Sequence, residues 1–462
     1  MIKKFFKTFL ACFRSIPAQF PCIEQLEARA LLAANFTELP GGSQSQVVAF
    51  NGKTYYAGDA GLYVTDGTRR GTNLVHQFES VDLTQVISHG HLYFTADDGI
   101  TGRELWRTDG TRAGTELVAD INPGPESSDP HVELALRSKV FLTADDGVHG
   151  LVLFVSDSTT AGRTVLTDIA QGSADSFPTS FAVGAGKRIY FTAEDQVHGS
   201  QLWVTDGSTI KFVTGLGLGD FGPGTFLTLR RITYFYKHNE LWKTNGTEQG
   251  TVRVAIVGHA GGQNNGSELI ESLHKLHGHL VFFVRHFSRI GEQISSSVFS
   301  SDGTAAGTTR LASFGAGSRI RGYATTRKRD IFVVNRDGRT KSMLWKTDGT
   351  PGGTTPITSI PYGAGFTMSA NATEAFYATG TFGSSAKPVI WRTDGTSSGT
   401  RSLATLPRFQ DPSVSPIYRN TTLFVSIDFF QMIGAPPKPT HLYVIPIPQA
   451  SVPLPLVVPR IT

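Results

Sequence analysis

Two pairs of adjacent acidic residues are the first candidates for chemistry in this chain. Asp97 and Asp98 form one pair, and Asp145 and Asp146 form the other in a matching context. Ca²⁺ prefers several oxygen ligands, so these four carboxylates are the candidate calcium ligands. Each pair also follows an apolar stretch and precedes a glycine, which is the composition of a tight turn. We expect the turn, with calcium as the alternative.

Histidines are densest at His274, His277, His279 and His286, where ligand type alone would allow a Zn²⁺ site. The segment His277-Gly278-His279 aligns with His89-Gly90-His91 in an earlier part of the chain, so a hairpin explains both. The sequence has no His-Glu-x-x-His motif, no complete phosphate loop and no nucleophile elbow. We therefore expect no catalytic residue, no cofactor and no bound zinc.

Most of the remaining candidate acids belong to a recurring segment, aromatic-x-x-(Thr/Ser)-(Asp/Asn)-Gly. Asp-Gly between two β-rich runs predicts a hairpin, because glycine accepts positive φ and aspartate caps the turn. The Asp/Asn position of the turn is occupied by Asp66, Asp109, Asp206, Asn245, Asp302, Asp348 and Asp394. Asn245 keeps the turn geometry without a charge, which favours a structural role over a metal site.

The aromatic position of the same segment collects all five tryptophans of the chain. Its occupants are Tyr63, Trp106, Phe154, Trp203, Trp242, Phe299, Trp345, Trp391 and, in a degenerate ninth copy, Tyr443. Large aromatic surface at one repeated position predicts packing between neighbouring repeats. The alternative is an exposed ring that stacks on sugars.

The segments around each copy predict four short antiparallel strands. An apolar stretch rich in β-branched and aromatic residues precedes the aromatic segment, and Gly-Thr-x-x-Gly-Thr leads into another strand. Four-stranded units repeated along a chain in this way are typical of an all-β fold, the β-propeller. We expect about eight blades, within a range of seven to nine, in one domain over residues 35–462. In such blades the Thr-Asp-Gly turns and the Lys- or His-bearing turns share one rim, and the acidic pairs lie on the other.

These residues resemble a bacterial repeat family written Glu-Leu-Trp-x-(Ser/Thr)-Asp-Gly-Thr-x-x-Gly-Thr, which occurs in secreted and surface proteins and has no assigned chemistry. Glu104 to Thr115 fits the pattern throughout, and the match covers most of residues 46–445. Ser158 replaces the turn glycine in one copy, and the copy after Gly207 lacks the second Gly-Thr.

Residues 1–34 differ from the rest and predict an export-type leader. Their longest apolar run, Phe9 to Phe13, is shorter than a secretory core or a membrane span requires. Leu26 to Ala33 resembles the Leu-Glu-Pro-Arg-x-Leu-Leu motif of exported bacterial proteins, with Ala28 in place of proline. We expect cleavage near Ala33 or Ala34. The alternative is an amphipathic helix that packs on the propeller.

Charge and composition exclude some partners. The formal net charge is +4, and five cations against two acids lie within residues 1–34, so the remainder is close to neutral. Nucleic-acid binders cluster their cations, so we expect no nucleic-acid partner, no transmembrane span, and a monomer.

The expected function is a non-catalytic module, secreted or on the surface of a bacterium, that binds a glycan, a protein or a matrix component. The alternative is a propeller enzyme that acts on polysaccharide as a glycosidase or lyase. That enzyme would need two carboxylates facing the central channel.

Overall fold

The computed structural model describes residues 37–445, with gaps at 41, 158–162, 168, 196, 198, 219–224, 259–266, 289–290, 337–340, 362–367, 380–388, 406–411, 420–421 and 430–440. The expected leader, residues 1–34, therefore lies outside the described residues. Within them the secondary structure consists of strands, and no helix is present that could span a membrane.

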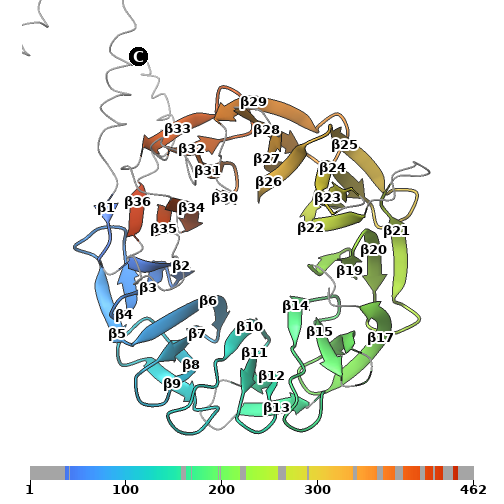
Figure 1. Cartoon of the computed structure of the whole chain (residues 1–462). Coiled ribbons are helices and arrows are strands. Elements are labelled where there is room, and N and C mark those ends of the chain that lie inside the picture. Colours follow the sequence, from blue (N-terminus) through green and yellow to red (C-terminus); the bar gives the residue numbers. More distant parts are fainter. Residues whose placement is uncertain are drawn as a thin grey trace, which may run out of the picture.

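The strands form nine four-stranded antiparallel sheets arranged as a ring around a central channel (Figure 1). We call these sheets blades 1 to 9 in chain order. Blades 1 to 3 consist of β2 (Gly42–Phe50), β3 (Lys53–Gly58), β4 (Gly61–Thr65) and β5 (Asn73–Gln77); β6 (Ser80–Ser88), β7 (His91–Asp97), β8 (Arg103–Thr108) and β9 (Thr115–Ala119); and β10 (His131–Leu136), β11 (Lys139–Asp145), β12 (Leu151–Ser156) and β13 (Arg163–Thr167).

The next three blades repeat this plan. Blades 4 to 6 consist of β14 (Thr179–Val183), β15 (Ile189–Asp195), β16 (Gly199–Thr205) and β17 (Ile210–Leu218); β18 (Leu227–Leu229), β19 (Ile232–Lys237), β20 (Glu240–Thr244) and β21 (Val252–Ile256); and β22 (Glu268–Leu276), β23 (His279–Phe287), β24 (Gln293–Ser301) and β25 (Thr309–Phe314).

The last three blades complete the ring. Blades 7 to 9 consist of β26 (Ser318–Thr325), β27 (Asp330–Arg336), β28 (Lys341–Thr347) and β29 (Thr355–Pro361); β30 (Met368–Ala370), β31 (Ala375–Thr379), β32 (Val389–Thr393) and β33 (Arg401–Thr405); and β34 (Pro412–Arg419), β35 (Thr422–Phe429), β36 (His441–Ile445) and β1 (Thr37–Glu38). The first strand of blades 1 to 8, and β34 in blade 9, lines the channel, and the fourth lies outermost (Figure 1).

The propeller predicted from the repeat is confirmed, and the described strands give nine blades, the upper limit of the expected range. The preferred count of eight was one too low. The degenerate ninth copy still provides three strands, and β1 from the other end of the chain supplies the fourth. Thr37 pairs with Val444 and Glu38 with Tyr443, so hydrogen bonds between the two ends of the domain close the ring.

The repeated aromatic residues pack between blades. Trp106 of blade 2 is 7% exposed and joins a cluster with Val48, Tyr55 and Phe78 of the preceding segment. Trp345 of blade 7 packs in the same way against Phe314 of blade 6, with ring centroids 5.0 Å apart. Because no blade covers both faces of its own sheet, each aromatic ring removes apolar surface of the preceding blade from water.

A β-bulge recurs beside this aromatic position. In blade 2 the register shifts so that Leu105 pairs with Ala119 but Trp106 pairs with Leu117. The same shift occurs at Leu344 and Trp345 in blade 7 and at the corresponding step of every other blade from 1 to 8. A bulge bends its strand and increases the local twist, so the outer strand curves at the point where the ring is inserted.

A buried glutamate fixes one crossover between blades. Glu104 is fully buried, and its carboxylate accepts hydrogen bonds from the backbone N–H groups of Ile121 (2.8 Å) and Ser128 (3.1 Å) and from the Ser128 hydroxyl (2.7 Å). These groups belong to the segment that leads from blade 2 to blade 3. The conspicuous first glutamate of the repeat motif therefore holds a loop in place.

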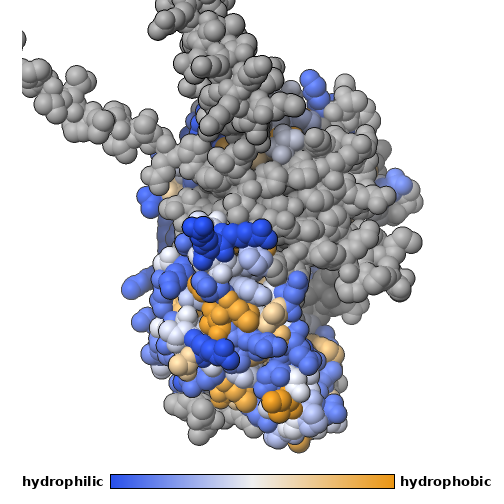
Figure 2. Space-filling model, turned by 90° about the vertical axis from the view of Figure 1, so that its left-hand side faces the viewer, coloured by the Kyte–Doolittle hydropathy of each residue, from blue (hydrophilic) through white to orange (hydrophobic). Residues whose placement is uncertain are grey.

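The outer surface beside blade 1 is largely polar (Figure 2). Viewed from the side of β1 to β5, the described surface is mainly hydrophilic, with apolar patches separated by strongly hydrophilic residues (Figure 2). The outer strand of blade 1, for example, exposes Leu74 at 45% beside polar neighbours. Scattered apolar side chains of this kind are normal on a protein surface.

Candidate functional site

The Asp-Gly turns are closed by their own side chains. In blade 2 the Asp109 Oδ1 atom accepts hydrogen bonds from the backbone N–H (2.8 Å) and the hydroxyl (2.7 Å) of Thr111. The Thr111 hydroxyl oxygen accepts a bond from the Gly114 N–H (3.0 Å), and the hydroxyls of Thr108 and Thr115 lie 2.8 Å apart. The Gly110 N–H also donates to the Thr108 hydroxyl (2.9 Å), so every specified residue of Thr-Asp-Gly-Thr-x-x-Gly-Thr in this copy takes part in one local network.

The other copies repeat this arrangement. Asp66, Asn245, Asp302, Asp348 and Asp394 each accept the same pair of bonds from the threonine two residues later. Asp206 departs from it and accepts backbone bonds from Ser208 and Thr209, as its shortened loop requires. Ser158, the other departure from the repeat, lies outside the described residues.

These bonds determine the charge state of the turn acids. The hydrogen bond from the Thr111 hydroxyl, reinforced by that from its backbone N–H, lowers the pKa of Asp109. The pKa of Asp302 is lowered for the same reason by Thr304. Such carboxylates are poor proton donors and already act as acceptors inside the turn, and Asn245 performs the same task without a charge.

The acidic pairs are also engaged in turns. Asp97 accepts the Gly99 N–H (2.8 Å), and Asp98 accepts the N–H groups of Ile100 (2.9 Å) and Thr101 (2.8 Å). Asp145 and Asp146 make the corresponding bonds in blade 3, where the Asp146 Oδ2 atom also lies 2.9 Å from His149 Nδ1. Among the described residues no group of three or more His, Cys, Asp or Glu side chains is placed to hold a metal ion.

The histidine group is divided between different environments. His274 is buried, with Nδ1 3.2 Å from Asp330 Oδ2, and its ring packs against Tyr323 with the ring centroids 4.0 Å apart. His286 is buried between Glu268 (3.1 Å) and Ser297 (2.9 Å). His277 lies in the exposed hairpin of blade 6, as the alignment with His89 predicts.

The carboxylates of the channel-lining strands all have partners. The described inner strands contain four such acids. Asp82 lies 3.8 Å from Arg103, Glu133 2.9 Å from His131, Glu268 3.1 Å from His286, and Glu271 3.2 Å from Arg285. Two unpaired carboxylates, as a glycosidase would need, are not present on the described part of these strands.

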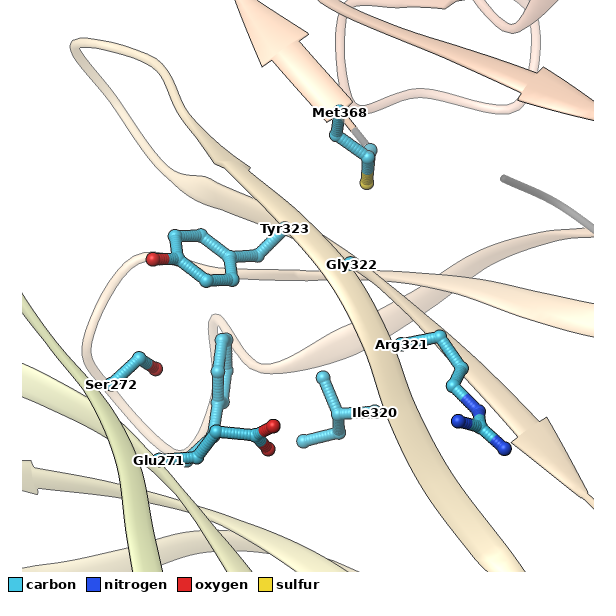
Figure 3. Close-up of a pocket in the computed structure, with 8 residues that line it drawn as sticks. Glu271, Ser272, Ile320, Arg321, Gly322, Tyr323 and Met368 are labelled. Atoms are coloured by element: carbon cyan, nitrogen blue, oxygen red, sulfur yellow. The ribbon is translucent and has the colours of Figure 1, made fainter. Parts of the chain in front are cut away.

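A hollow on the channel side lies between blades 6 and 7 and has a volume of about 380 Å³. Its walls come from β22 and β26, with Met368 of β30 at one edge (Figure 3), and Phe283 of β23 also lines it. The lining residues are Glu271, Ser272, Phe283, Ile320, Arg321, Gly322, Tyr323 and Met368. We call this hollow the channel pocket.

The channel pocket combines an apolar floor with polar groups. Tyr323 is 41% exposed, and Ile320 and Phe283 lie buried beside it. Ser272 is only 5% exposed, and its Oγ atom has no hydrogen-bond partner within the described part of the chain. Leaving a buried hydroxyl without a partner costs free energy, so a ligand group that reached the Ser272 Oγ atom would be favoured.

Charged groups of both signs lie at the channel pocket: Glu271 and Arg321 line it, and Arg285 is ion-paired with Glu271. Burial raises the pKa of Glu271, while the nearby guanidinium groups of Arg285 and Arg321 act in the opposite direction. Burial, followed by the charges of Asp330 and Glu271, raises the pKa of Tyr323, so its hydroxyl stays protonated at neutral pH. The channel pocket is thus lined by a protonated phenol, a serine, an arginine and one ion-paired carboxylate.

Sequence reasoning did not identify the channel pocket. The residues of the repeat motif lie in the turns and between the blades, whereas Tyr323 and Ser272 lie on inner strands with no recurring motif. The only signal was the polar run Ser318-Arg319-Ile320-Arg321 where an apolar alternation would be usual. A β-bulge between Ile320 and Gly322 shifts the register of this strand, which a period-two pattern cannot anticipate.

Comparison with known proteins adds no functional assignment. No family model and no curated protein matches the chain. Among solved structures, similarity is found to the computationally designed Ika8 protein, with 14% identity, a TM-score of 0.43 and coverage of 80% of this chain and 97% of that one. An oligogalacturonate lyase in complex with manganese shows 10% identity and a TM-score of 0.41, with 88% and 98% covered.

A third similar structure is prolyl oligopeptidase B from Galerina marginata, with 11% identity and a TM-score of 0.38. The match covers 76% of this chain and 55% of that one, so the chain spans about half the length of the peptidase. Values this low carry no inference about the activity of this chain.

Proposed function

We propose that this chain is a non-catalytic binding module, located outside a bacterial cell, that holds a saccharide unit in the channel pocket. The observation that carries the proposal is the combination, in one hollow, of an exposed tyrosine ring with a buried serine hydroxyl that lacks a partner. Ligand sites typically combine an apolar surface with a few convergent polar groups, in volumes of about 300–1,000 Å³.

A saccharide fits these groups better than a wholly apolar ligand. The C–H face of a sugar ring can lie on the aromatic face of Tyr323, and its hydroxyls can bond to Ser272 and Arg321. The guanidinium also suits an acidic sugar, because it donates two parallel bonds to a carboxylate.

Binding is favoured over catalysis by the state of the acids. Glu271 is the one carboxylate among the lining residues of the channel pocket, and Arg285 is ion-paired with it. Glycoside hydrolysis normally uses two carboxyl groups about 5–9.5 Å apart on either side of the bond that is cleaved. The polysaccharide-acting enzyme therefore stays the second choice.

Location outside the cell rests on residues 1–34 and on the resemblance of Leu26 to Ala33 to an export motif. Both cysteines lie in that segment, so a chain processed near Ala33 would contain no thiol. Intact-mass analysis and fractionation of the source bacterium test this. A chain that keeps Met1 and stays inside the cell would contradict the proposal.

A glycan array followed by calorimetry tests the binding role. We expect Tyr323→Ala to weaken binding of the selected saccharide about tenfold or more, because ring contacts of this kind contribute on the order of 1–2 kcal/mol. Phe212→Ala is the matched control, since Phe212 is 49% exposed on the outer strand β17. Release of shortened products from the bound saccharide would establish the enzyme instead, and unchanged affinity in Y323A would remove the channel pocket as the site.

A further inference from the structure

A second surface, independent of the channel pocket, gathers positive charge on one rim of the propeller. The hairpins between the first and second strands of blades 3, 4 and 5 carry Arg137, Lys187, Arg188, Arg230 and Arg231, all of them exposed. These blades are consecutive in the ring (Figure 1). We call the five residues the basic arc.

Four of the five cations occupy backbone positions that do not suit them. Arg137 has a φ of 57°, Lys187 57°, Arg230 50° and Arg231 66°, in the left-handed region that favours glycine and asparagine. A two-residue hairpin is most stable with Asn-Gly or a similar pair at these positions.

Other blades of the same chain use that more stable solution. The two-residue hairpin at the corresponding place is Asn51-Gly52 in blade 1, and His-Gly in blades 2 and 6. Blade 5 has Arg230-Arg231 there instead. Strained positions that are kept despite an available relaxed alternative tend to serve a function, and the feature that these hairpins share is their positive charge.

Internal contacts account for little of this charge. Within the described residues the basic arc forms no ion pair with Asp or Glu, and Arg188 donates one hydrogen bond to the Asn245 carbonyl (2.9 Å). That bond links blade 4 to the Asp-Gly type turn of blade 5. The other four cations, Arg137, Lys187, Arg230 and Arg231, are exposed to solvent.

A hollow of about 190 Å³ adjoins the basic arc between blades 4 and 5. Arg188 belongs to both features, and Lys211 adds a further cation to the wall of the hollow. The lining also includes Thr205, Thr209, Thr247, Val204, Asp206 and Gly246. Cations and threonine side chains therefore occur together at this place.

We propose that the basic arc and this hollow bind an acidic polysaccharide. The cations would pair with its carboxylate or sulfate groups, and the threonine hydroxyls with its sugar hydroxyls. Asp206, whose backbone bonds from Ser208 and Thr209 lower its pKa and keep it charged, lies in the same hollow. Duplex DNA has about one phosphate charge per 1.7 Å of its axis, so phosphates bound here would be repelled by the Asp206 carboxylate. A polysaccharide spaces its charges more widely.

The test uses a variant that removes charge and relaxes the backbone together. In R137N/K187N/R230N/R231G every new residue suits a positive φ, so the fold is retained. Binding of the full propeller to alginate and to dextran sulfate is measured at about 50 mM and 200 mM NaCl, with neutral dextran as reference. We expect wild-type binding that weakens with salt, and about tenfold weaker binding by the variant.

The control variant is R253Q/R310Q/K341Q/R401Q, which removes the same number of exposed cations away from the basic arc, and it should bind within about twofold of wild type. Preference between the two polymers distinguishes carboxylate from sulfate recognition. No wild-type binding to either polymer, equal losses in both variants, or tighter binding to a DNA duplex than to both polymers would overturn the proposal.

Discussion

The Asp-Gly turn of blade 2 allows a direct test of whether the repeated acids are structural. The structure predicts a ranked series of variants at Asp109 and Gly114, because the Asp109 side chain packs directly over Gly114. In Asp109→Asn the amide Oδ1 atom can accept the same two bonds from Thr111, as Asn245 does in blade 5. We expect its free energy of unfolding to stay within about 0.5 kcal/mol of wild type.

Removing the acceptor or filling its space should have larger effects. Asp109→Ala loses two hydrogen bonds worth about 0.5–1.5 kcal/mol each, so we expect a loss of about 1–2 kcal/mol. In Gly114→Ala the new Cβ would overlap the Asp109 carboxyl group, and the forced shift should cost about 1–3 kcal/mol. In the double variant the alanine at position 109 removes the overlap, so the two losses should fall short of additivity by about 1 kcal/mol.

Urea unfolding followed by tryptophan fluorescence measures the series, with the midpoints compared at a common slope. A loss in D109N as large as that in D109A would mean that the charge of the carboxylate matters, as it would in a metal site or a reactive group. Strict additivity of D109A and G114A would show that the two residues do not meet. Either result would refute the explanation of the repeat motif.

Three further predictions concern buried or strained groups. Glu104→Gln places an amide N–H₂ opposite groups that donate to the carboxylate, so we expect about 2 kcal/mol of destabilisation in urea unfolding, and an unchanged midpoint would contradict the anchoring role. Burial raises the pKa of Glu104 above its ordinary value of 4.5. The folded state therefore holds the Glu104 proton more tightly than the unfolded state does. The contribution of Glu104 to stability is present at low pH and falls as the pH rises through the folded-state pKa. E104Q should remove this part of the pH dependence of unfolding, measured between about pH 4 and 7. R230N/R231G should raise the free energy of unfolding by about 1–2 kcal/mol, because asparagine and glycine tolerate the positive φ of these two positions better than arginine does. A lower thermal midpoint would show instead that the arginines stabilise the hairpin.

The channel pocket and the basic arc consist of residues outside the repeat motif. Copies of the repeat motif form the turns and the contacts between blades, which every blade needs. The channel pocket and the basic arc occur where individual blades depart from their neighbours, at Tyr323 and at Arg230-Arg231. Binding surfaces on repeat proteins are expected at such departures, because residues free of the packing requirement can vary.

The sequence alone was sufficient for the four-stranded unit, the propeller class and the arrangement of turns on two rims. These features depend on local chemistry. Asp109 accepts hydrogen bonds from a residue two positions away, and the aromatic position that Trp106 occupies is the same in every repeat unit. Only the tertiary structure decided the ninth blade, closed by β1 and β36, and the channel pocket between Ser272 and Tyr323. These features join residues far apart in the chain, and their geometry depends on bulges and on how blades pack, neither of which leaves a periodic signal in the sequence.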